Sequence, residues 1–107
     1  MNSSATPQDH FANFAEFYAY YLSEHRNVVC RRLHFAGTTL VLGFFVAAIV
    51  TANAWLLLAM PVAGYSLAWV GHFYFEKNRP ATFSHPVYSL IADFVLFRDL
   101  LTGRIRF

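Results

Sequence analysis

Three of the five histidines in this 107-residue sequence, His25, His34 and His72, are placed where they could bind one metal ion together. Glu76 follows His72 by four residues and shares its helical face, and His85 lies slightly further along the chain. Neutral imidazole and carboxylate suit iron, zinc or manganese, and a histidine-rich site with open positions is the usual setting for non-haem Fe(II) oxygen chemistry. The alternative is that each histidine only hydrogen-bonds a neighbouring helix or a lipid headgroup.

The stretch 33–75 must position these histidines, and it contains no Asp, Glu, Lys or Arg. An apolar helix of about 20 residues spans a bilayer core, so the stretch is long enough for two spans. Small and polar residues at 51–54 interrupt it, as expected for a tight connection between helices. The sequence therefore predicts a transmembrane hairpin with helices over 33–50 and 55–75. A buried helical pair in a soluble bundle is the alternative, but it would need more surrounding sequence to cover it.

The predicted hairpin brings two of the histidines to the same depth. His34 lies eighteen positions before Ala52, and His72 lies nineteen positions after Asn53. At 1.5 Å per residue, an antiparallel pair folded at that turn places both imidazoles at the same end. An ionisable residue inside a membrane span is a functional hypothesis by default, because burying it costs free energy. We therefore expect the two imidazoles to be partners in one site.

The polar segment 23–34 precedes the hairpin and contains His25. On one continuous helix, nine residues would separate His25 and His34 onto opposite faces. Both can reach one site only if the backbone bends near Asn27, a residue type that suits such a break. The single cysteine, Cys30, excludes an intrachain disulfide and a CxxC metal site. We interpret it as a small buried apolar residue.

Basic residues flank the hairpin at its two ends and are missing from its turn. Arg26, Arg31 and Arg32 precede the first span, and Lys77 and Arg79 follow the second. By the positive-inside rule, both ends of the hairpin face the cytoplasm, and the histidines and both chain termini lie on that side.

Two amphipathic helices are predicted on either side of the hairpin. The first covers 6–24, with Thr6 as its N-cap and an aromatic stripe at three- and four-residue spacing. The second covers 86–102, carries one apolar stripe and ends before Gly103. The first is too polar to span a bilayer, so we expect it at the interface or against the hairpin. Charged residues interrupt the second, which we expect to be interfacial or half-inserted. His10, on the first helix, is expected at the surface.

The composition agrees with an all-α membrane protein of one domain, a transmembrane hairpin flanked by amphipathic N- and C-terminal helices. Hydrophobic residues make up 57% of the chain and charged residues 13%, about half the usual share in soluble proteins. A net charge of +2 without a basic stripe excludes nucleic acid as a partner. Neither a Gly-x-Ser-x-Gly elbow nor a phosphate-binding glycine loop is present. The oligomeric state, including a homo-oligomer, stays open.

Three pieces of the sequence resemble a known family. They are His-Arg-Asn at 25–27, His-x-x-Gly at 34–37, and Gly-His-x-x-x-Glu at 71–76 with an Arg-Pro-Ala tail. In this order and spacing they resemble the small membrane-protein family that includes the yeast endoplasmic-reticulum 2-hydroxy fatty acid dioxygenase. The resemblance extends from Phe14 to Gly103.

The resemblance implies an Fe(II)-dependent α-oxidation, in which a 2-hydroxy fatty acid and O₂ yield CO₂ and a fatty acid one carbon shorter. It implies that His25, His34 and His72 hold the iron, with His85 as an extra candidate ligand. The acyl chain would lie along the apolar hairpin, in a groove lined by Phe residues. Because the chain is compact like the bacterial members, we expect it in a bacterial inner membrane.

Three arginines before the first span are candidate substrate ligands. Arg26, Arg31 or Arg32 could attract the carboxylate of the fatty acid. The equally simple alternative is that they determine topology or contact phospholipids.

Two other functions fit the same residues. His34 and His72 could be paired axial ligands of a haem in an electron-transfer protein, which a Soret band would reveal. The chain could also be a non-catalytic lipid-binding or assembly module whose histidines only form hydrogen bonds. Metal analysis separates that module from the iron enzyme.

Overall fold

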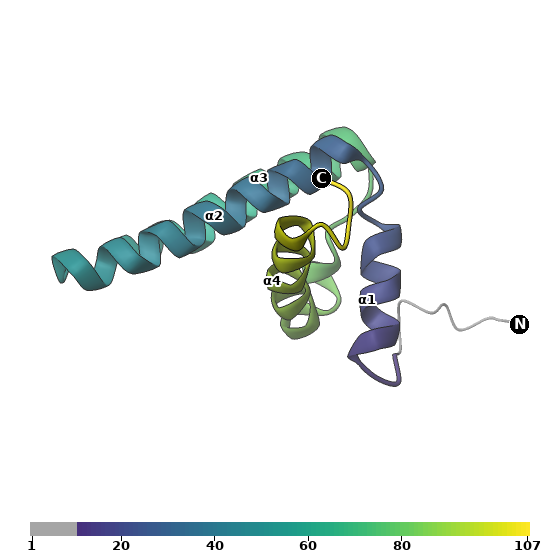
Figure 1. Ribbon diagram of the computed structural model, residues 1–107, viewed down its shortest axis with the longest axis horizontal. Helices are drawn as coiled ribbons and strands as arrows, with labels where there is room; N and C mark the ends of the chain where they lie inside the picture. The colour runs from purple at the N-terminus through teal and green to yellow at the C-terminus, as the bar shows by residue number, and fades with distance from the viewer. Residues whose placement is uncertain (1–10) are drawn as a thin grey trace, which may run out of the picture.

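The computed structural model describes residues 11–107, which contain helices and no strand (Figure 1). The predicted all-α fold is therefore confirmed for this part of the chain. The elements in order are α1 (Phe14–Ser23), α2 (Val28–Thr51), α3 (Leu56–Val70), the π-helix η2 (Gly71–Glu76), the 3₁₀-helix η3 (Ala81–Phe83) and α4 (Pro86–Thr102).

Helices α2 and α3 form the predicted hairpin and lie side by side along their length (Figure 1). The turn after Thr51 is closed by Ala52, which adopts the left-handed conformation with φ 54° and caps α2. Gly37 on α2 and Gly64 on α3 let the two backbones approach closely, since a Cβ on Gly37 would lie 3.3 Å from the Gly64 carbonyl oxygen. Small residues at such a contact are typical of helix pairs in membranes.

The hairpin exposes apolar surface that needs a covering. Val28–Thr51 and Leu56–Glu76 are both long and apolar enough to cross a membrane, yet only 22% and 11% of their most apolar windows are buried within the structure. At the free tip, Val50 and Trp55 are 77% and 78% exposed. A core helix of a soluble protein would instead be largely buried. The structure therefore has two helices suited by length and composition to a bilayer.

Helices α1 and α4 pack together beside the opposite end of the hairpin, away from its tip (Figure 1). Their contact forms the main buried core, in which the α4 side chains Ala92, Leu96 and Leu100 meet Phe17 and Tyr21 of α1. This packing brings one face of α4 toward the end of the hairpin that carries the histidines.

Helix boundaries differ from the sequence expectation at the starts of α1 and α2, and the helix expected over 55–75 is formed by α3 together with the π-helix η2. The sequence predicts one helix from residue 6, whereas residues 11–13 are not helical and α1 begins at Phe14, because Asn13 accepts a hydrogen bond from the Glu16 amide as N-cap. The predicted cap Thr6 and the surface residue His10 lie outside the described residues.

Helix α2 begins at Val28, five residues before the expected start at Leu33. The cause is Asn27, whose side-chain oxygen accepts hydrogen bonds from the amides of Val29 and Cys30. The expected backbone break near Asn27 is thus present as a helix cap, and the link between α1 and α2 at 24–27 is not helical.

Candidate metal centre

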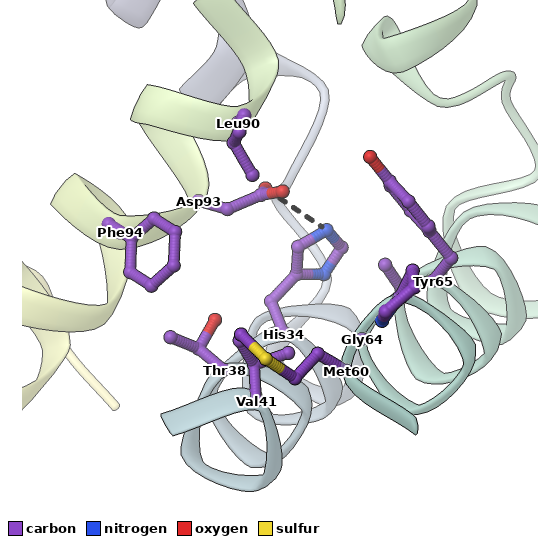
Figure 2. A pocket seen from close by; sticks show the side chains of 11 residues that line it. His34, Thr38, Val41, Met60, Gly64, Tyr65, Leu90, Asp93 and Phe94 are labelled. Atoms are coloured by element: carbon purple, nitrogen blue, oxygen red, sulfur yellow. Dashed lines mark ion pairs between the residues drawn. The ribbon is translucent and has the colours of Figure 1, made fainter. Parts of the chain in front are cut away.

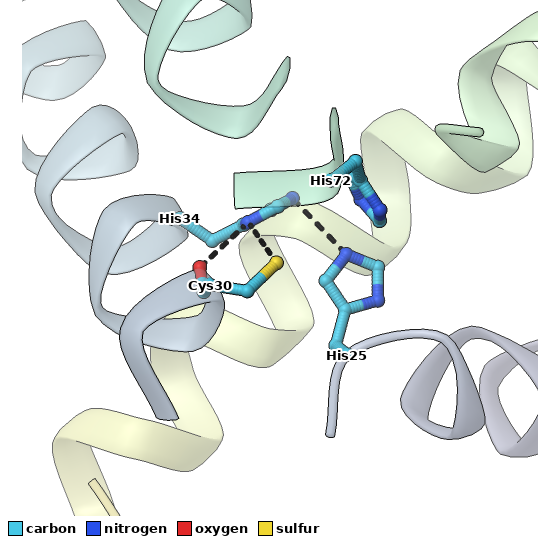
Figure 3. A group of neighbouring side chains, drawn as sticks. All are labelled: His25, Cys30, His34 and His72. Carbon is cyan, nitrogen blue, oxygen red and sulfur yellow. Dashed lines mark hydrogen bonds between the residues drawn. The ribbon is translucent and has the colours of Figure 1, made fainter. Parts of the chain in front are cut away.

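The three histidines singled out from the sequence meet at the base of the hairpin (Figure 3). The ring centroids of His25 lie 4.4 Å from those of both His34 and His72, and the latter two are 5.1 Å apart. All three residues are buried, with exposed fractions of 1%, 5% and 2%. They come from three elements, the α1–α2 link, α2 and η2, so the site exists only in the folded chain.

Local structure explains how each ring reaches the site. The cap at Asn27 ends the helical path between His25 and His34, so the two are no longer held on opposite faces. On the other side, Gly71 begins η2 against Cys30, and a Cβ added to Gly71 would lie only 2.8 Å from the Cys30 Sγ. The glycine therefore permits the close approach that carries the next residue, His72, into the group. A π-helical turn at such a place is common at functional sites.

Each imidazole is oriented by a hydrogen bond from Nδ1 to a carbonyl oxygen. The pairs are His25 Nδ1 to Tyr21 O at 2.6 Å, His34 Nδ1 to Cys30 O at 3.0 Å, and His72 Nδ1 to Asn78 Oδ1 at 2.6 Å. Carbonyl oxygens only accept, so Nδ1 carries the proton and Nε2 of each neutral ring keeps a free lone pair. This arrangement of outer partners is typical of metal-binding histidines.

The Asn78 side chain is itself fixed by the end of α1. Its Nδ2 donates to the Glu24 backbone oxygen at 3.1 Å and to the Glu24 carboxylate at 3.3 Å. These contacts assign the amide nitrogen and leave Oδ1 facing His72. Arg31 similarly donates from Nε to the His25 carbonyl at 2.7 Å and holds the link that carries that histidine.

The donor set fits a metal ion. The Nε2 atoms of His25 and His34 lie 3.1 Å apart, although neither carries a proton to share when both rings are neutral. Two imidazole nitrogens at about 2.0–2.1 Å from one divalent ion and at right angles would lie about 3 Å apart. Burial, reinforced by the neighbouring His34 and His72, lowers the pKa of His25 well below its usual value. The neutral form that binds metals is therefore favoured.

Cys30 is buried as expected, but its thiol also belongs to the group. The Sγ lies 3.8 Å from His34 Nδ1, and the donor atoms of Cys30 and the three histidines all lie within 4.8 Å of one another. The sequence reasoning placed this residue in the core without connecting it to the site. Its position four residues before His34, on the same face of α2, was the available signal.

Two further predicted ligands are not brought to the group. The Glu76 carboxylate accepts a hydrogen bond from the Asn27 backbone N–H and so joins η2 to the start of α2. The His85 ring packs against the rings of Phe11 and Phe17, with centroids 5.1 Å and 5.4 Å away. Its Nδ1 forms a hydrogen bond with the hydroxyl of the neighbouring Ser84.

The arginines proposed for the substrate have different surroundings. Arg26 is exposed, whereas Arg32 donates to the Phe107 carbonyl at 3.3 Å and lies over the Phe107 ring. Arg31, as described, supports the His25 backbone and also reaches the Arg106 carbonyl at 3.3 Å. The described contacts of Arg31 and Arg32 thus link α2 to the end of the chain.

The structure adds Asp93 of α4, to which the sequence reasoning assigned no role in the site. Its Oδ1 lies 4.0 Å from His34 Nε2 (Figure 2), and the same carboxylate accepts a hydrogen bond from the Tyr21 hydroxyl. Burial raises the pKa of Asp93 to about 6 despite that hydrogen bond. An acidic residue on the apolar side of an amphipathic helix was the signal that could have identified it.

A cavity of about 300 Å³ adjoins His34 and Asp93 between α2, α3 and α4 (Figure 2). It extends from these two residues toward the tip of the hairpin. Its walls are largely apolar and include Thr38, Val41, Met60, Tyr65, Leu90 and Phe94.

Over residues 11–107, the fold and the site define a class of protein. It is all-helical, has two helices that could span a membrane, and contains a buried histidine group that could hold a metal ion. A family model described as "2-hydroxy-palmitic acid dioxygenase Mpo1-like" matches residues 11–105, and the chain belongs to this family. The resemblance found in the sequence is therefore confirmed. Comparisons with curated proteins and with solved structures gave no match.

Proposed function

We propose that the protein is an Fe(II)-dependent dioxygenase that shortens 2-hydroxy fatty acids by one carbon. The observation that carries the proposal is the convergence of three imidazoles, from His25, His34 and His72, in a buried group next to an apolar cavity, each with its Nδ1 hydrogen-bonded to a carbonyl oxygen. The family description supports the dioxygenase class and a fatty acid substrate.

The proposed reaction balances without an external reductant. One 2-hydroxy acid and one O₂ give one CO₂, one water and a fatty acid that is one carbon shorter. The C1–C2 bond breaks, the hydroxyl-bearing C2 becomes the new carboxyl carbon, and the electrons that reduce O₂ come from the substrate. Iron, when bound, supplies a Lewis acid and a redox centre.

The chain's own residues hold and enclose that centre. The three imidazoles bind the ion through Nε2, while Tyr21, Cys30 and Asn78 orient them through Nδ1. Because the histidines are nearly inaccessible to solvent, bulk water is kept from the site. Exclusion of water strengthens electrostatic interactions and limits side reactions.

The cavity is suited to the acyl chain of the substrate. The polar head would lie at the end formed by His34 and Asp93, and the methylene chain would extend past Thr38 toward Val41 and Met60. The sequence predicts a groove lined by Phe residues for the acyl chain. The lining of this cavity is instead mixed, with Phe94 beside aliphatic and Tyr side chains. The proposal places the hairpin in a bacterial inner membrane, with its histidine end and both termini on the cytoplasmic side.

The geometry favours this reading over the haem alternative. Paired axial ligands would have to lie on opposite faces of a macrocycle that separates them, but the His25 ring contacts both His34 and His72, with its centroid 4.4 Å from each. The space adjoining His34 and His72 on the α4 side is only about 10 Å³. This volume is enough for about one water molecule, far below what a porphyrin needs.

Turnover of 2-hydroxypalmitate tests the proposed function. The purified protein, loaded anaerobically with Fe(II) and then exposed to O₂, should convert this acid into pentadecanoic acid and one equivalent of CO₂. Product analysis of the same protein after a chelator has removed the iron provides the control. Full iron loading without any product would contradict the proposed activity, whereas less than stoichiometric iron would support the non-catalytic alternative, whose histidines only form hydrogen bonds.

Substitution at the far end of the cavity should change the preferred chain length. Met60→Trp places a larger side chain at the end away from His34, so long substrates should lose kcat/KM relative to short ones by about 10-fold or more. Leu58→Trp is the matched control, because Leu58 is 60% exposed and lies outside the cavity wall. Competition between 2-hydroxy acids of different length measures the effect, and an unchanged ratio in Met60→Trp would contradict this binding mode.

A further inference from the structure

Two polar residues of α4 face the histidines from the side opposite the hairpin. Ser89 and Asp93 are four residues apart, so they share one face of the helix. Both line a small void together with His34 and His72. Its volume of about 10 Å³ leaves room for roughly one ion or water molecule.

Asp93 and His34 approach each other as two hydrogen-bond acceptors. His34 donates its Nδ1 proton to the Cys30 carbonyl, so its Nε2 can only accept while the ring is neutral. The Asp93 carboxylate lies 4.0 Å from this nitrogen and is held by the Tyr21 hydroxyl. A cation between them would give both groups a common partner.

Ser89 independently indicates that the void receives a polar ligand. The residue is 2% exposed, and within residues 11–107 its Oγ is the one buried side-chain nitrogen or oxygen atom without a hydrogen-bond partner. An unsatisfied buried hydroxyl costs about 1–3 kcal/mol, so its position beside the histidines calls for an occupant.

Charge balance favours a carboxylate at this position. A divalent ion held by three neutral imidazoles alone would keep its full charge in a buried site, which is unfavourable without a compensating group. The Asp99 carboxylate is bonded to Tyr18 at 2.7 Å and to Arg98 at 3.1 Å. Glu76 is engaged at the start of α2. Within residues 11–107, the Asp93 carboxylate is paired with a histidine of the group, with its Oδ1 4.0 Å from His34 Nε2.

We propose that Asp93 supplies a carboxylate ligand to the ion held by His25, His34 and His72, and that Ser89 hydrogen-bonds an oxygen ligand in the same void. The inference rests on the proposed metal centre and adds a carboxylate to its protein donors. Tyr21 then supports two ligands at once, because its hydroxyl holds Asp93 while its carbonyl orients His25.

Anaerobic titration of the full-length protein in lipid nanodiscs with Co(II) and with Fe(II) tests this assignment. Asp93→Asn keeps an oxygen that can accept from Tyr21, so helical content and thermal unfolding should be retained. It should weaken metal affinity at least about 10-fold and change the visible absorption of bound Co(II). Asp99→Asn is the matched control, since it removes a carboxylate paired with Tyr18 on the same helix, and it should bind like wild type.

A conservative variant separates a ligand from a merely structural residue. Asp93→Glu keeps the carboxylate and should retain more affinity than Asp93→Asn, with a Co(II) spectrum closer to wild type. Wild-type affinity and spectrum in Asp93→Asn, or a Glu variant no better than the Asn variant, would overturn the assignment of Asp93 while leaving the histidine centre intact. Failure of the wild-type protein to bind either metal would overturn both the centre and this inference.

Discussion

His72→Ala and His34→Ala should each abolish stoichiometric Fe(II) binding and reduce turnover of 2-hydroxypalmitate by at least about 100-fold. Removal of a direct ligand should cost more than the 10- to 100-fold loss typical of outer-sphere substitutions. Each variant also leaves too few imidazole donors to enclose an ion. Metal content after gel filtration and product analysis measure the two effects.

His85→Ala is the control for these variants. The ring packs against Phe11 and Phe17 and lies outside the group of metal donors, so its removal should leave the iron content unchanged. Wild-type iron content in both His34→Ala and His72→Ala would show that the site is assigned to the wrong residues.

Gly71→Ala should have the second largest effect, although it removes no ligand. Its Cβ would lie 2.8 Å from the Cys30 Sγ and 3.2 Å from the Cys30 Cα, so η2 and α2 must separate. Overpacking of this kind costs about 1–3 kcal/mol of stability. Since His72 follows directly and His34 lies one turn after Cys30, the metal affinity should also fall by about 10-fold or more. Thermal unfolding and Fe(II) titration provide the two readouts.

Two variants identify the steric cause. Gly43→Ala adds the same methyl group where nothing lies within 4 Å, and it should be neutral or stabilise α2 by about 0.5–1 kcal/mol. Cys30→Ala removes the closest atom, so combining it with Gly71→Ala should recover part of the lost thermal stability. Equal behaviour of the Gly43 and Gly71 variants would contradict the close-contact explanation.

The hairpin and the meeting of its two histidines could be predicted, because both follow from the number of residues between the histidines and the turn. A long stretch without charged residues defines the helices, and a central turn determines which positions lie at the same depth. His34 and His72 then meet with their ring centroids 5.1 Å apart. The contribution of His25 depended on a backbone break, for which Asn27 was a recognisable local signal.

The rest of the site depends on packing between segments far apart in the sequence. Asn78 reaches His72 only because the chain turns back after η2, and Asp93 faces His34 only because α1 and α4 pack together. No periodicity in a single segment specifies such contacts. The sequence shows the Asp93 carboxylate beside apolar residues, but it does not indicate that His34 is its partner.

The position of Glu76 shows how a local rule can be overruled. Its spacing from His72 placed both on one helical face and favoured a shared site. However, the first amides of a helix lack partners within the helix, and the Glu76 carboxylate accepts from the Asn27 N–H at the start of α2 instead. The π-helical geometry of η2, which the sequence did not predict, also changes which residues share a face.

X-ray absorption at the iron edge of the Fe(II)-loaded protein tests most directly whether three imidazoles from separate elements hold one ion. We expect one iron per chain, a first shell of nitrogen and oxygen atoms, and multiple scattering from about three imidazole rings. A stoichiometrically loaded protein whose spectrum contains no imidazole contribution, or the absence of any bound iron, would contradict the account.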